Sequence, residues 1–126
     1  MANDKIHDAV VQATRCDYPT LVKQAMQEYK RAAVENALDP LPYELALVFD
    51  DEHQQYIVRS VGWQKNKRIL TTILHVAIRD GKLWIEEDWT EEGIATYFLE
   101  HGVPNDQIVL GFQAPTMRQY TEFAVA

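Results

Sequence analysis

The chain has 126 residues, of which 47% are hydrophobic and 25% charged, a balance typical of one globular domain and not of a disordered chain. Nineteen acidic against twelve basic side chains give a formal net charge of −7, which disfavours non-specific nucleic-acid binding unless the cations gather on one face. One cysteine, Cys16, excludes an internal disulfide and a zinc site built from several thiolates.

Apolar residues recur at helical spacing in two stretches of the first third of the chain. The first stretch follows a cap at Asn3 or Asp4, and the second starts near Pro19, which suits the first turn of a helix. Two closely spaced prolines, Pro40 and Pro42, end the second helix. The two apolar stripes are Ile6, Ala9, Val10 and Ala13, and then Leu21, Val22, Ala25, Met26, Tyr29, Ala32 and Ala33.

From residue 43 the chain is rich in β-branched and aromatic residues, which favour strands. Strands are predicted at residues 44–49, 56–63, 68–79 and 82–88, with turns at 50–53 and 64–67. Asp80 and Gly81 form the strongest turn signal, because a type I′ turn needs positive φ at both central positions. Short turns between successive strands indicate an antiparallel meander.

A further helix follows the strands. Asp88 and Glu91 have the spacing of a capping box, and Thr90 is a competing cap. Its buried stripe is Ile94, Ala95, Phe98 and Leu99. Residues 108–112 form either a short strand or the start of a buried coil. The predicted fold is therefore α+β: N-terminal helices, a four-stranded antiparallel β-meander, one further helix and a short C-terminal strand or tail.

Catalytic and metal sites have weak support in this sequence. A half-buried structural thiol is favoured over a nucleophile for Cys16. The four histidines are scattered, and His75 is expected to be a hydrogen-bonded histidine within a strand. The acidic run at residues 86–92 could hold a divalent cation, but carboxylates at the positive end of a helix explain it without one. We therefore predict no enzyme and no cofactor.

Two surfaces remain as candidate contacts. Trp63, Lys65, Lys67 and Arg68 place three cations beside an aromatic ring, which suits either a phosphate or a partner protein. The alternative is a hairpin kept soluble by its lysines.

The C-terminal segment ends in apolar residues, whereas most free tails are polar. Arg118, Tyr120, Phe123 and Val125 are its candidate interface residues. The segment docks on its own domain or on a partner, and a homodimer to which it contributes is the favoured assembly. The first residues lack the apolar core of a signal peptide, so we expect a cytoplasmic protein without a membrane span.

An ordered set of segments resembles the XisI proteins, the fdxN element excision controlling factors. The segments are VGWQ at 61–64, LHV at 74–76, GKLWI at 81–85, TEEGIA at 90–95, GVP at 102–104, IVLGF at 108–112 and RQYTEFAVA at 118–126. Family members usually begin with one main helix near the position of Tyr18. Residues 1–126 are thus expected to form one XisI-like domain in which residues 1–17 are an N-terminal extension.

The resemblance implies a cyanobacterial accessory protein, encoded beside a partner called XisH and associated with excision of a DNA element during heterocyst differentiation. The recombinase that cuts the DNA is a separate protein. XisH-type proteins resemble restriction-endonuclease-like folds, and the resemblance implies that the XisI protein acts as an antidote to such a partner. It supplies no catalytic residue. The alternative is direct DNA binding through the hairpin at residues 63–68, which would modulate the recombinase.

Overall fold

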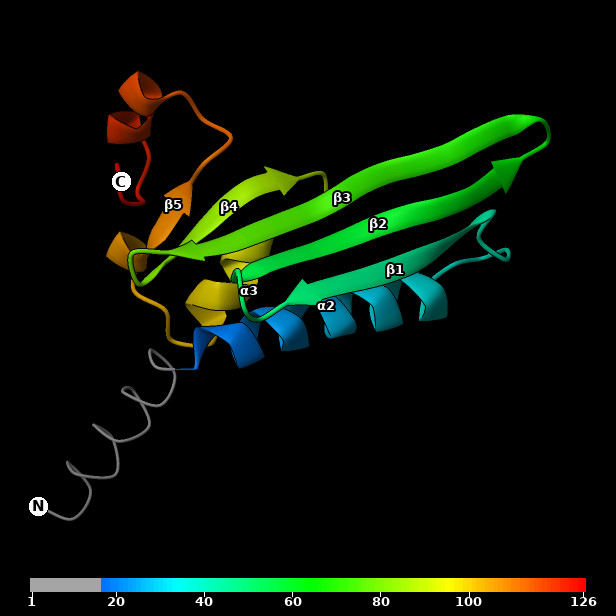
Figure 1. Cartoon of the computed structure of the whole chain (residues 1–126), viewed down its shortest axis with the longest axis horizontal. Helices are drawn as coiled ribbons and strands as arrows, with labels where there is room; N and C mark the ends of the chain where they lie inside the picture. The colour runs from blue at the N-terminus through cyan, green and yellow to red at the C-terminus, as the bar shows by residue number, and fades with distance from the viewer. Residues whose placement is uncertain (1–16) are drawn as a thin grey trace, which may run out of the picture.

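A computed structural model of the chain describes residues 17–126 (Figure 1). The first predicted helix, with His7 and Cys16, lies outside the described residues. The second is confirmed as α2 (Tyr18–Glu35), with Pro19 in its first turn. Residues at helical spacing on one side of α2 are buried: Tyr18, Leu21, Val22, Ala25 and Met26.

The predicted meander is confirmed. Its strands are β1 (Tyr43–Asp50), β2 (Gln55–Gln64), β3 (Lys67–Arg79) and β4 (Lys82–Asp88). Each pairs antiparallel with the next. A fifth strand, β5 (Ile108–Leu110), pairs parallel with β4 at the edge of the sheet, after the chain has crossed through α3 (Ile94–Glu100). Two 3₁₀ helices, η1 (Asn105–Gln107) and η2 (Pro115–Tyr120), flank β5.

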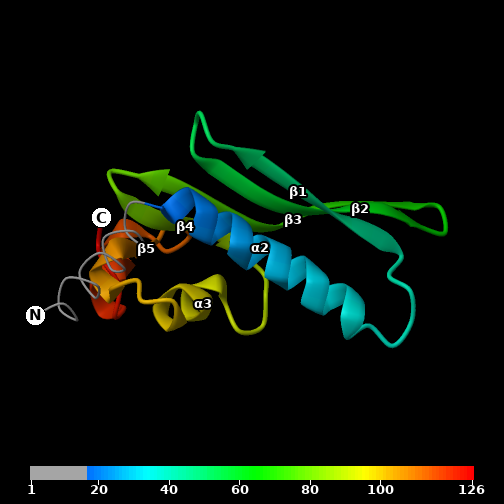
Figure 2. The ribbon, with the colours of Figure 1, turned by 90° about the horizontal axis from the view of Figure 1, so that it is seen from below.

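Both helices cover the same face of the sheet (Figures 1 and 2). In β2 every second residue from Tyr56 to Ser60 is buried against them, and Val58 is fully enclosed. Phe98 of α3 is also fully buried in the core between the helices and the sheet. No helix of residues 17–126 covers the other face of the sheet, and we call it the open face. None of the described helices is both long and apolar enough to cross a membrane.

The start of α3 differs from the predicted capping box. The carboxylate of Asp88 accepts hydrogen bonds from the Thr90 amide (2.9 Å), the Thr90 hydroxyl (2.6 Å) and the Ile94 amide (2.7 Å). Gly93 has a φ of 82°, which prevents the helix from starting earlier. Glu91 is exposed and is not the reciprocal partner, so the capping box was wrong. The carboxylate of Asp88, six residues before the first residue of α3, still accepts a hydrogen bond from the first amide of that helix.

The turn between β3 and β4 has the predicted type I′ conformation, because Asp80 and Gly81 have φ values of 53° and 73°. A Cβ atom added at Gly81 would meet nothing within 4 Å, so a substitution there acts through the backbone alone. We expect Gly81→Val to lower the free energy of unfolding by about 1–3 kcal/mol, because a β-branched residue resists positive φ. Urea unfolding measures this, with Gly81→Asn as the control that tolerates the conformation. A Gly81→Val protein as stable as wild type would contradict the assigned turn.

Candidate functional site

The first candidate surface is the basic tip: Trp63, Lys65, Lys67 and Arg68 around the turn between β2 and β3. All four side chains are exposed. The Arg68 guanidinium carbon lies 5.1 Å from the centroid of the Trp63 ring, within cation–π range. None of the ion pairs found within residues 17–126 includes a cation of the tip. The structure thus brings these four residues together as three cations without an ion pair and one aromatic ring.

The basic tip stands at the end of a long hairpin, at the opposite end of the molecule from the C-terminal segment (Figures 1 and 2). The two candidate surfaces are therefore separate. A single compact ligand does not touch both, whereas two different macromolecules could occupy them at once.

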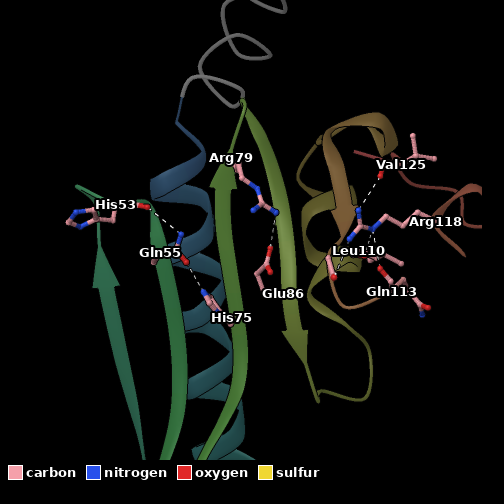
Figure 3. A network of polar contacts seen from close by, with 10 residues as sticks. His53, Gln55, His75, Arg79, Glu86, Leu110, Gln113, Arg118 and Val125 are labelled. Atoms are coloured by element: carbon pink, nitrogen blue, oxygen red, sulfur yellow. Dashed lines mark hydrogen bonds and ion pairs between the residues drawn. The ribbon is translucent and has the colours of Figure 1, made fainter. Parts of the chain in front are cut away.

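Arg118 has a different environment from the one expected of an interface residue. Its guanidinium donates hydrogen bonds to four backbone carbonyls of its own chain (Figure 3). The acceptors and distances are Leu110 (3.2 Å), Gln113 (3.1 Å), Gly111 (3.3 Å) and Val125 (3.3 Å). Since these bonds use its Nε and both terminal nitrogens, Arg118 positions the C-terminal segment against β5.

Arg118 also lies against Trp84. The guanidinium carbons of Arg79 and Arg118 lie 3.8 Å and 5.2 Å from the centroid of that ring. Arg79 in turn reaches Glu86 at 3.5 Å. Sequence analysis did not single out Trp84 or Arg79. The signal was present, because alternation along β4 places Trp84 on the face opposite the buried Leu83.

The last residues dock on their own domain through the backbone and leave large side chains outside. The Ala124 amide donates to the Ile108 carbonyl (2.9 Å), and Ala124 forms a parallel bridge with Val109. Phe123 is half-buried against the core. Tyr120 and Val125 remain 77% and 55% exposed. The segment is thus held in place while it presents apolar groups to solvent.

The acidic turn, residues 50–52 between β1 and β2, lies at the other end of β2 from the basic tip. The Lys23 ammonium (2.9 Å) and the Tyr56 hydroxyl (2.8 Å) donate to the Asp51 carboxylate, and they hold the pKa of that carboxyl below its ordinary value. Burial, and then the hydrogen bond to the Asp51 carboxylate, raise the pKa of Tyr56. Hydrogen bonding from the amide and ring of His53 lowers the pKa of Asp50. These carboxylates are therefore ionised at neutral pH.

The described histidines lie in separate places. His75 and Gln55 pair across two strands, with Nε2 and Oε1 2.7 Å apart, which confirms the hydrogen-bonded histidine in a strand (Figure 3). The His101 ring stacks on Tyr97 with centroids 3.9 Å apart. Within residues 17–126, no group of three or more His, Cys, Asp or Glu side chains is placed to hold a metal ion.

Comparison with known proteins gives a consistent result. The model of the XisI protein family matches residues 13–125. A crystal structure of a XisI-like protein from Anabaena variabilis ATCC 29413 is 36% identical and has a TM-score of 0.78; the match covers 89% of this chain and 99% of that one. The crystal structure of the fdxN element excision controlling factor XisI from the same organism is 34% identical and has a TM-score of 0.74, over 90% and 99% of the two chains. No curated protein matches the sequence. Because the family model and both structures match over most of its length, this chain belongs to the XisI family.

Proposed function

We propose that this protein is a controlling factor for the excision of a DNA element, and that it acts by binding a partner protein and not by catalysis. The observation that carries the first part is the likeness to the fdxN element excision controlling factor XisI, which matches over nearly its whole length at 34% identity. A protein that controls excision without cutting DNA must act on the machinery that does.

The proposed partner is a XisH-like protein, and the proposed contact is the C-terminal segment. Tyr120 and Val125 are exposed on a segment that Arg118 holds in one conformation, so little conformational entropy is lost when a partner covers them. The net charge of −7 suits a partner whose own surface is basic, as that of a nucleic-acid enzyme is. Covering such a surface would give the protein the role of an antidote.

Affinity purification tests this proposal. The tagged full chain is expressed with a XisH-like protein from the same genome, and we expect the two to purify together. Tyr120→Ala with Val125→Ala should reduce the recovered partner, while Val34→Ala, an exposed apolar position on α2, should not. Failure of the wild-type protein to retain the partner would overturn the partner assignment.

The rival function is direct DNA binding through the basic tip, which the unpaired cations of Lys65, Lys67 and Arg68 favour. If the tip contacts phosphates, changing these three residues to Ala weakens binding and lowers its salt slope by about three units at most. We expect instead that the wild-type protein does not retard duplex DNA at low salt, because the whole chain is acidic. Retardation that the triple variant abolishes would establish the rival.

A further inference from the structure

The open face of the sheet carries two pairs of apolar residues, one on each side of Arg59 along β2. Register pairs Val48 with Ile57 across β1 and β2, and Val61 with Leu70 across β2 and β3. Since paired residues share a face and the alternate residues of β2 are buried against the helices, these four side chains all point away from the helices. Leu70 and Val48 are 50% and 46% exposed. We call these four residues the apolar patch.

The two ends of β2 carry opposite charge, and the apolar patch lies between them. The acidic turn holds Glu52 beside Asp50 and Asp51, and the basic tip holds the three cations described above. Glu52 and the tip cations take part in none of the ion pairs found within residues 17–126. An isolated copy therefore leaves Glu52 at one end of β2, and the three tip cations at the other, without an ion pair among the described residues.

This arrangement is self-complementary. A twofold axis perpendicular to β2 stacks this strand on the β2 of a second copy that runs in the opposite direction. The basic end of each strand then lies over the acidic end of the other. We propose that two copies of this chain pack open face against open face about such an axis. The basic tip of each copy then lies against the acidic turn of the other, with the two apolar patches between them. The proposal concerns a second copy of this chain and does not rest on the proposed function.

The geometry is that of a two-sheet sandwich, in which the sheets lie about 10 Å apart with their strands within about 30° of each other. Arg59 lies near the middle of β2 on the open face, and its Nε is buried without a hydrogen-bond partner among residues 17–126. Glu44, on the same face of the neighbouring strand, would bring one carboxylate from each copy to the side of the two arginines.

The apolar patch favours a second copy of this chain over nucleic acid as the partner of the open face. Val48, Ile57 and Leu70 offer nothing to a phosphate backbone, whereas a second sheet face buries them. Covering these side chains is favourable because it removes apolar surface from water. A stable interface of standard size covers about 800 Å² on each copy, so the contact must extend from the apolar patch to both charged ends of β2.

Sedimentation velocity on the pure full chain, without nucleic acid, tests the proposal. We expect a dimer, and we expect Leu70→Glu to convert it to a monomer. Val34→Glu is the matched control, because Val34 is 57% exposed but lies on α2, and it should leave the dimer intact. Thermal melting of each variant shows whether it is folded. A wild-type monomer, or a folded Leu70→Glu dimer, would overturn the proposal.

Charge reversal tests the antiparallel arrangement even if Leu70→Glu does not fold. Glu52→Lys and Lys65→Glu should each weaken the dimer about tenfold, because each places like charges together twice. A mixture of the two variants should favour the mixed dimer, since each reversed residue then meets an opposite charge. Native mass spectrometry with one variant ¹⁵N-labelled measures the mixed fraction. A fraction at the statistical value of one half would refute the arrangement.

Discussion

Deleting residues 120–126 lowers the free energy of unfolding by about 3 kcal/mol and weakens partner binding with it. The deletion removes the half-buried Phe123, the hydrogen bond from the Ala124 amide to Ile108, and the Val125 carbonyl that Arg118 binds. Arg118 would keep its other acceptors, so β5 should remain paired with β4. Thermal and urea unfolding measure the first effect, and co-purification with the XisH-like protein measures the second.

A point variant separates the two roles of this segment. Tyr120→Ala removes an exposed ring, so its stability should stay within about 0.5 kcal/mol of wild type while partner binding falls. A truncated protein that keeps its stability but loses its partner would make the segment an interface element alone. A truncated protein unchanged in melting temperature, oligomeric state and partner binding would contradict both roles.

Gly62→Ala destabilises the protein by about 2–3 kcal/mol, although it adds one methyl group. A Cβ atom at this position would lie 2.7 Å from the Pro42 carbonyl oxygen and 2.8 Å from the Tyr43 Cα, both in the backbone that enters β1. Because both atoms belong to backbone, β1 must move away from β2 to make room. Glycine at this place in the resemblance segment at 61–64 is thus explained by the close approach of two strands.

Urea unfolding measures the effect of Gly62→Ala. The control is Gln64→Ala, two residues further along β2 and exposed, which we expect to change stability by less than about 0.5 kcal/mol. Equal stability of Gly62→Ala and wild type would mean that the start of β1 does not pack this closely in solution.

Sequence alone predicted the meander well because its signals are local. The β-branched and aromatic residues of β2, and the Asp80 and Gly81 pair that forms the turn, are signals carried by residues a few positions apart. The start of α3 was misplaced because Gly93 has positive φ and the carboxylate that serves the first amide, Asp88, lies a full loop away. Capping rules consider only the residues next to the start of a helix, so they do not identify a hydrogen-bond acceptor that lies a loop away.

The candidate site was predicted only in part. The four residues of the basic tip are adjacent in sequence, so their clustering followed from a hairpin. The role of Arg118 at an interface stays a prediction, and its hydrogen bonds to backbone carbonyls of its own chain were not predicted. The stack of Arg79, Trp84 and Arg118 was missed, because it joins residues from three separate segments.

The sequence by itself determined the four strands of the meander and where their turns fall, since strand composition and turn chemistry act over short distances. Only the tertiary structure decided that β5 pairs parallel with β4, that both helices cover one face and leave the other open, and that the C-terminal segment is clamped beside Trp84. Those outcomes depend on contacts between segments far apart in the chain. Bringing such segments together costs conformational entropy, which is offset only when the whole core forms.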